Sequence, residues 1–288
     1  VEEVITPVDR PEGTPPDEPR IALQERSEFG PLPIVAADGQ RSATVYARRV
    51  LQLDVPRIAI VMTDLGLDET RTAVAIERLP ADVSLAFHPY APNLNDKIAA
   101  ARLDGHESLL AIPMEPLDYP LDDPGPNPLL TEATPQENRM ALYRSLGSAE
   151  GYVGLTNFMG SALLEDRRVL TPIMSEIEDR GLLFIDNNTA INSVSDRVAI
   201  GFNMPYGRSN RLIDALPTAA DIDEQLQGLE ALAKLNGSAI GFAQPFPVTL
   251  QRLDEWIPLL RSRGIDLVPV SAVAKRQLQQ GAQTADGS

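Results

Sequence analysis

Short apolar runs alternate with longer amphipathic stretches from about residue 57 to about residue 270. Runs of four or five residues with few polar side chains are typical of parallel strands that are buried on both faces. Seven runs each predict a strand: Ile58–Met62, Val83–Phe87, Ser108–Ile112, Gly151–Leu155, Leu182–Ile185, Ala239–Phe242 and Leu267–Val270.

Between the runs, apolar residues recur at helical spacing. The spacing predicts helices at Asp68–Arg78, Asn95–Leu103, Pro135–Leu146, Arg167–Arg180, Ile222–Leu235 and Thr249–Arg263. The predicted N-caps are Asp68, Asn95, Thr134 and Thr249. The glycines expected where helices end are Gly105, Gly181 and Gly264.

Strand followed by helix, repeated along the chain, predicts parallel strands joined by right-handed crossovers. The alternatives are a barrel or an open doubly wound sheet. The turn after the first run reads Thr63-Asp64-Leu65-Gly66 and lacks the GxGxxG pattern of a nucleotide-binding sheet. We therefore predict an α/β fold, a distorted barrel of about seven parallel strands.

The composition excludes several classes of function. With 25 Lys+Arg against 41 Asp+Glu, the formal net charge is −16, which repels phosphate backbones and anionic lipid, so we expect no nucleic-acid partner. The chain has no cysteine, and therefore no disulfide, thiolate metal ligand or cysteine nucleophile. No apolar run approaches the roughly 20 residues of a membrane span.

The two ends of the chain differ from the part between them. Residues 1–45 are rich in proline and acids, which predicts an extended or disordered tail; the alternative is a strap docked on the domain. The apolar residues that would dock are Ile21, Leu23, Phe29, Ile34 and Val35. We expect the folded domain at 46–276 and a disordered C-terminus at 277–288. The chain begins at Val1, so a membrane anchor or signal segment upstream stays open.

Polar side chains follow most of the runs. In barrels of this type the C-terminal ends of the strands meet at one face and carry the chemistry, so these side chains are expected to converge. They are Thr63, Asp64, His88, Glu115, Asn157, Asp186, Asn188 and Gln244. Strand ends are also where strands leave the core, so a binding site and ordinary loop polarity are equally open.

Five segments in order resemble signature motifs of the divergent polysaccharide deacetylase family, a branch of the sugar deacetylases with the NodB-like fold. They are Ile58–Gly66, Leu85–Pro92, Gly105–Pro116, Asn157–Ser161 and Gln244–Pro247. The resemblance covers about Arg57 to Val273. It implies a NodB-like barrel and a bacterial envelope setting, either periplasmic or anchored in the inner membrane and facing the periplasm.

The resemblance also implies a chemistry. Active members of the wider superfamily bind a divalent metal through one aspartate and two histidines, while a second aspartate acts as base and another histidine as acid. The metal lowers the pKa of a bound water and polarises the acetyl carbonyl. Asp64 matches the metal aspartate.

The chain departs from that pattern at several positions. Thr63 stands where the base is expected, and Phe158 stands where the histidine of Asn-His-Met-Gly-Ser is expected. Ala111 replaces a polar or histidine side chain, and Gln244 replaces the late histidine. A phenylalanine has no lone pair for a metal, and an amide neither titrates nor binds zinc well. We therefore predict a pseudoenzyme without a cofactor.

Two histidines remain in the chain, His88 and His106. His106 opens a strand at the opposite end of the barrel, so we expect it to be structural. If a metal such as zinc or manganese binds, Asp64 and His88 are the candidate ligands. If the site is active, the candidate catalytic residues are Asp64, His88 and Glu115. The expected ligand-binding set is Asp64, His88, Tyr90, Glu115, Asn157, Asp186 and Gln244.

Three functions remain open. The first is a non-catalytic envelope protein that binds a glycan, a peptidoglycan fragment, or a cell-wall hydrolase or its regulator during cell-wall remodelling. The second is an active metal-dependent carbohydrate deacetylase or hydrolase with a rearranged site on Asp64, His88, Glu115 and Asp186. The third is a protein that holds a partner through its outer helices and leaves the pocket empty.

Overall fold

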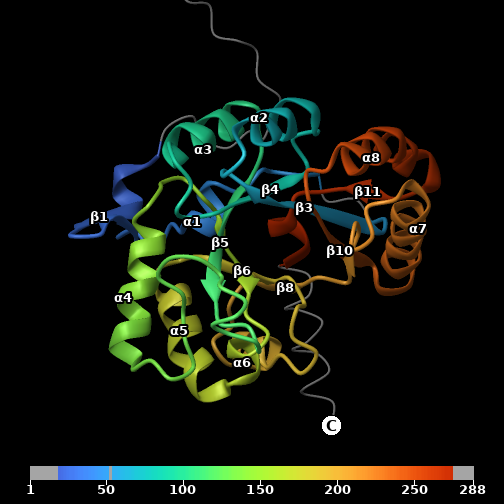
Figure 1. Ribbon diagram of the computed structural model, residues 1–288. Coiled ribbons are helices and arrows are strands. Elements are labelled where there is room, and N and C mark those ends of the chain that lie inside the picture. The colour runs from blue at the N-terminus through green and yellow to red at the C-terminus, as the bar shows by residue number, and fades with distance from the viewer. Residues whose placement is uncertain (1–18, 52–53, 275–288) are drawn as a thin grey trace, which may run out of the picture.

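The computed structural model describes residues 19–51 and 54–274 (Figure 1). The strands are β1 Gln24–Ser27, β2 Gly30–Pro33, β3 Arg57–Leu65, β4 Ser84–Phe87, β5 Ser108–Met114, β6 Gly154–Met159, β7 Leu183–Asp186, β8 Tyr206–Arg208, β9 Arg211–Leu212, β10 Ser238–Ala243 and β11 Asp266–Leu267. The α-helices are α1 Ser42–Val45, α2 Glu69–Arg78, α3 Leu94–Leu103, α4 Pro135–Leu146, α5 Arg167–Asp179, α6 Ser195–Gly201, α7 Ala219–Asn236 and α8 Pro247–Leu260. Short 3-10 turns are Ile21–Leu23, Leu163–Glu165 and Arg261–Arg263.

Nine strands form one curved sheet in the order β8-β7-β6-β5-β4-β3-β10-β9, with β11 paired to the start of β3. All pairings in this sheet are parallel. The edge strands β8 and β9 are consecutive in the chain and are separated by Ser209 and Asn210. The chain thus passes from one edge of the sheet to the other, and the predicted distorted barrel is confirmed.

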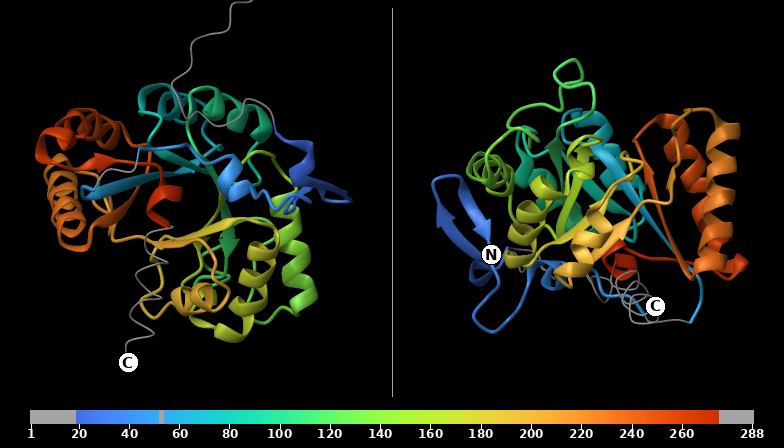
Figure 2. Two further views of the ribbon diagram at one scale, coloured as in Figure 1. Left: turned by 180° about the vertical axis from the view of Figure 1, so that it is seen from behind. Right: turned by 90° about the horizontal axis from the view of Figure 1, so that it is seen from below.

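Helices surround the sheet on its outer side (Figure 1, Figure 2). One core cluster holds outward-facing strand residues, such as Ile60, together with helix residues, such as Leu229 and Leu253. A second cluster fills the inside of the curve with the alternate strand residues, such as Val61, and reaches Leu23, Tyr46 and Val270. Each of the seven predicted strands and six predicted helices overlaps one of these elements. Two strand predictions are displaced: the strand predicted at Gly151–Leu155 begins only at Gly154, and the one predicted at Leu267–Val270 ends at Leu267, before a helix that begins at Val270.

Two predicted caps are wrong. Helix α3 begins at Leu94 and α8 at Pro247, so Asn95 and Thr249 lie inside their helices. The hydroxyl of Thr249 donates instead to Asp214 Oδ2 at 2.9 Å. Thr134 does cap α4, in a capping box with Glu137. Within the described residues, no helix combines the length and the apolar composition needed to cross a membrane.

For residues 19–45 the structure describes the docked strap that the sequence left as an alternative. The β1–β2 hairpin packs on α4, and Leu23 and Leu32 are buried. Arg180, directly after α5, holds the hairpin through Glu25 Oε1 at 2.9 Å. The predicted disorder of residues 1–18 and 277–288 falls outside the described residues.

At the N-terminal end of the barrel, Glu107 ties the segment that follows the strap to the far end of the described chain. Its carboxylate is fully buried and accepts from the backbone N–H of Arg48 and from the N–H and hydroxyl of Ser271. We expect Glu107→Ala to lower the free energy of unfolding by about 3 kcal/mol, because buried donors lose their acceptor. In thermal unfolding this is a fall in Tm of about 6–12 °C.

The matched control is Glu224→Ala, which removes an exposed acid from α7. Its Tm is expected to stay within about 2 °C of the wild type. An equal Tm for the two variants would contradict the role assigned to Glu107.

Candidate functional site

The end of β3 presents a carboxylate to solvent. Asp64 has φ 58°, in the left-handed region that aspartate tolerates better than most residues. At Gly66, φ is 105°, and a Cβ there would lie 2.5 Å from the Cβ of Ala91. The side chain of Asp64 is 31% exposed. A turn that only glycine fits thus holds an accessible acid at the strand end.

His88 follows β4 and faces Asp64. Its Nε2 lies 3.4 Å from Asp64 Oδ1, and the side chain is only 3% exposed. The ring packs edge-on against Phe158, with centroids 4.7 Å apart, and lies 5.2 Å from the ring of Tyr90. Its Nδ1 is buried and has no hydrogen-bond partner among the described residues. Asp64, His88, Tyr90 and Phe158 therefore form one contiguous group, here called the strand-end cluster.

Phe158 lies near the end of β6, where the following turn holds the strand end at this cluster. Met159 has φ 56° and Gly160 has φ 97°. The amide of Asn157 donates to Met159 O at 2.6 Å and to Asn187 Oδ1 at 2.6 Å, while Thr189 also donates to Met159 O. The side-chain amide of Asn157 therefore stabilises the turn. Hydrogen bonds to the carbonyl of Met159 therefore hold the backbone beside residue 158, where the side chain is a phenyl ring.

Asp214 is a residue that the sequence analysis missed. It follows β9, is 4% exposed, and its Oδ2 accepts from Gln244 N at 2.7 Å and from Thr249. Its Oδ1 is buried without a partner among the described residues. Burial raises the pKa of Asp214; the Gln244 and Thr249 hydrogen bonds oppose this, and the charge of Asp64 raises the pKa further.

Tyr90 links the cluster to the loop between β5 and α4. Its hydroxyl lies 3.5 Å from Pro124 O, and a Cβ on Gly125 would come within 2.9 Å of the same hydroxyl. Burial raises the pKa of Tyr90, and the charges of Asp64 and Asp123 raise it further. The acids around the cluster therefore set up a negative potential at this ring.

Other predicted site residues are engaged elsewhere. Glu115 accepts from the N–H and hydroxyl of Thr131 and so anchors the β5–α4 loop. Asp186 is fully buried and accepts from Asn188 N and from the hydroxyls of Ser193 and Ser195.

Two further predicted residues are also held by local partners. Asn188 accepts from Arg208 Nε at 2.9 Å. His106 is buried at the other end of the barrel, with its ring nitrogens 2.8 and 3.1 Å from the carbonyl oxygens of Val83 and Ile76. The structure therefore brings together Asp64, His88 and Tyr90, but not Glu115, Asn157 or Asp186.

The residues present do not fit the metal implied by the family. Two ligands of one tetrahedral zinc at about 2.0–2.1 Å lie about 3.3 Å apart, so the 3.4 Å between His88 Nε2 and Asp64 Oδ1 suits a pair of ligands. A third ligand is missing, because Phe158 fills the adjoining position. In residues 19–51 and 54–274 no three His, Cys, Asp or Glu side chains are grouped to hold an ion.

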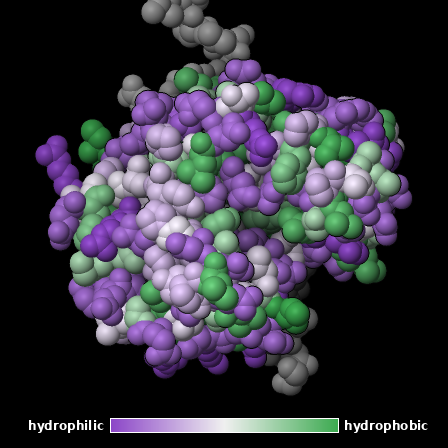
Figure 3. All heavy atoms as spheres, viewed as in Figure 1, coloured by the Kyte–Doolittle hydropathy of each residue, from purple (hydrophilic) through white to green (hydrophobic). Residues whose placement is uncertain are grey.

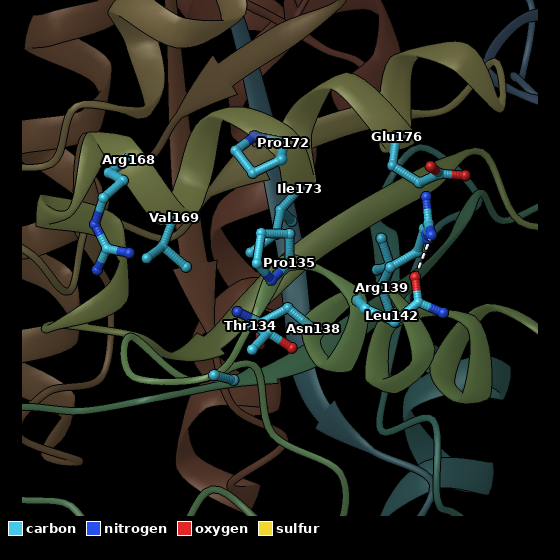
Figure 4. Close-up of a pocket in the computed structure, with 12 residues that line it drawn as sticks. Thr134, Pro135, Asn138, Arg139, Leu142, Arg168, Val169, Pro172, Ile173 and Glu176 are labelled. Atoms are coloured by element: carbon cyan, nitrogen blue, oxygen red, sulfur yellow. Dashed lines mark hydrogen bonds between the residues drawn. The ribbon is translucent and has the colours of Figure 1, made fainter.

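A hollow lies outside the barrel, between α4 and α5 (Figure 4). It has a volume of about 440 Å³ and a mainly apolar lining that includes Pro135, Leu142 and Ile173. Arg168 and Glu176 stand toward its two ends in Figure 4. This α4–α5 groove shares no lining residue with the strand-end cluster.

Exposed apolar side chains also stand in several loops after strands. Leu67 follows β3, Leu117 and Leu121 follow β5, and Ile191 follows β7, each more than half exposed. Figure 3 shows separate hydrophobic patches around a hollow on the face that Figure 1 presents. The strand-end side of the molecule is therefore both acidic and partly apolar.

This barrel, with an aspartate at the end of its first sheet strand and the ordered motifs around it, defines a sugar-deacetylase type of protein. The sequence profile of the divergent polysaccharide deacetylase family matches residues 60–274. The chain belongs to this family, and the predicted resemblance and NodB-like fold are confirmed.

The chain is also similar to a solved structure and to two bacterial proteins. A crystal structure of an uncharacterised Agrobacterium tumefaciens protein, ATU2773, is 38% identical, superposes with a TM-score of 0.83, and is matched over 85% of this chain and 99% of that one. The Escherichia coli protein YibQ, also uncharacterised, is 28% identical over 202 residues. A Haemophilus influenzae protein is 27% identical over 194 residues. These matches cover 70% and 67% of this chain, but 62% and 68% of the two relatives.

Proposed function

We propose that this member of the family is catalytically inactive and binds a glycan at the strand-end cluster, in the remodelling of bacterial peptidoglycan. The observation that carries the proposal is the contact between Phe158 and His88, with ring centroids 4.7 Å apart and an interplanar angle of 85°. A phenyl ring there removes a metal ligand and supplies an apolar face on which a sugar ring can stack.

Two further substitutions support inactivity. Thr63 lies beside Asp64 where the family's base stands, and a hydroxyl does not take up a proton near neutral pH. Gln244 occupies the place of the acid, and its backbone N–H is held by Asp214. Accessible carboxylate and aromatic groups remain, which suits binding of hydroxyl-rich ligands. The setting we propose is the periplasm, with or without a membrane anchor upstream.

An activity and binding assay tests this proposal. We expect no acetate release from an N-acetylglucosamine oligomer, with or without added zinc, and retention of the protein on purified peptidoglycan. Asp64→Ala is expected to reduce this retention at least about tenfold, a loss of about 1.4 kcal/mol. Asp104→Ala, an exposed acid at the opposite end of the barrel, is the control and is expected to bind as the wild type does.

The competing function is an active metal-dependent deacetylase with a rearranged site. It would be established by turnover that chelators abolish and that Asp64→Ala removes. The geometry offers such a site little support, since Glu115 and Asp186 are bound to their own loops.

A protein partner is the second candidate function, and the α4–α5 groove favours it. An apolar groove of about 440 Å³ falls within the range of binding pockets, about 300–1,000 Å³. Pro172→Trp changes an exposed side chain that lines this groove. If this variant loses function in cells while its retention on peptidoglycan is unchanged, the partner-binding interpretation replaces the glycan-binding one.

A further inference from the structure

The strand-end cluster joins negative charge to aromatic faces. Asp64 is partly exposed, and Asp214 lies near enough for the charge of Asp64 to raise its pKa. Tyr90 and Phe158 are both half-buried and flank the ring of His88. Carboxylate beside aromatic rings is the arrangement by which proteins recognise organic ammonium ions.

Within residues 19–51 and 54–274, neither a lysine nor an arginine pairs with the carboxylate of Asp64 or Asp214. Among the described residues, no lysine or arginine nitrogen lies within 4.0 Å of a carboxylate oxygen of Asp64 or Asp214. The ion pair that these residues do form is that of His88 with Asp64. Elsewhere acids are routinely paired, as Asp223 is with Arg252 and Glu230 with Arg263.

A separate observation points to a ligand. Asp214 is 96% buried, and its Oδ1 has no hydrogen-bond partner among the described residues. Nδ1 of His88 is equally buried and without a partner there. Buried polar atoms are nearly always satisfied. Two residues that interact with Asp64 thus each carry a buried polar atom without a partner among the described residues, which is the observation that points to a ligand.

We propose that the cluster selects the free amine of a deacetylated amino sugar over its N-acetylated form. This rests on the proposed glycan binding and names the ligand class of the same site. The ammonium would meet the carboxylate of Asp64, and the sugar ring would lie against Tyr90 and Phe158. The chain would then bind the product of a sugar deacetylase, so the reaction that supplies its ligand is de-N-acetylation.

The test compares two glucosamine tetramers, one with free amines and one fully N-acetylated. Binding is measured by calorimetry at about pH 6, where amines keep their proton, and at about 0.15 M salt, which screens diffuse attraction to an acidic protein. We expect the free-amine tetramer to bind at least about tenfold more tightly.

Asp64→Asn is the informative variant, because asparagine also tolerates the left-handed backbone at this position. It is expected to lose the preference for the amine and to keep the affinity for the acetylated tetramer. Asp104→Asn changes the net charge equally at a distant exposed site and is expected to keep the preference. Phe158→Ala is expected to weaken binding of both tetramers.

The outcomes separate the two proposals. Equal, Asp64-dependent binding of both tetramers overturns amine selection but leaves glycan binding in place. Binding of neither tetramer overturns both. A preference that falls equally in Asp64→Asn and Asp104→Asn overturns the inference, since the attraction would then come from overall charge.

Discussion

Phe158→His is expected to create a zinc site in this protein. Asp64 Oδ1 and His88 Nε2 are already spaced as two ligands of one tetrahedral ion, and the turn at Met159 aims residue 158 at His88. An imidazole there would add the third ligand, and water would complete the open coordination of a catalytic zinc. Zinc titration with a competing chelator should give a Kd at least about tenfold lower than that of the wild type.

Two controls define the result. Phe158→Leu removes the ring without supplying a ligand, and Phe158→His with His88→Ala restores the count to two ligands. Both are expected to bind zinc no better than the wild type. If Phe158→His binds zinc no more tightly than Phe158→Leu, residue 158 does not occupy a ligand position.

Asp186→Ala is expected to be among the most destabilising single changes in the domain. The carboxylate accepts from Ser193 and Ser195 at 2.7 and 2.6 Å, and Ser195 is also within hydrogen-bond distance of the buried hydroxyl of Tyr206. Burial raises the pKa of Tyr206, as does the charge of Asp186. Removing the acceptor takes a charged partner from two buried serine hydroxyls, at a cost of about 3–5 kcal/mol.

Thermal unfolding measures this cost as a fall in Tm of about 6–20 °C. Asp186→Asn keeps the shape and one acceptor, so an intermediate loss is expected. Asp179→Ala, at an exposed position in α5, is the control and should change Tm by less than about 2 °C. A wild-type Tm for Asp186→Ala would return Asp186 to the list of candidate ligand-binding residues.

The apolar runs predicted the strands because parallel strands buried on both faces need unbroken apolar sequence. The search for apolar runs did not predict the elements between Asp186 and Asp214. There α6 is only seven residues long, β8 three and β9 two, so they carry too few residues for any periodicity to emerge. Asp214 was missed for this reason, although an acid directly after the apolar Leu212-Ile213 was its available signal.

Side-chain alternation explains why some of the predicted site residues lie apart from the strand-end cluster. Ile185 belongs to the cluster inside the sheet, so its neighbour Asp186 must face the opposite side. Phe158 faces His88 in the cluster, and Asn157 before it is used by the turn. His88 keeps the inward phase of Ala86. Asp64 has the outward phase of Met62 and reaches the strand-end cluster through the register shift between Met62 and Leu65 and its positive φ. A list of polar strand ends distinguishes neither the phases nor this irregularity.

The passage from β8 to β9 through Ser209 and Asn210 has a consequence for the protein at high concentration. Asn210 exchanges hydrogen bonds with Ile240, its N–H donating to the carbonyl and its Oδ1 accepting from the amide. The edges of the nine-stranded sheet are thus short and partly covered by their own connection. A long bare edge is where a strand of another molecule can add. We expect this sheet to resist edge-to-edge aggregation while the barrel stays folded.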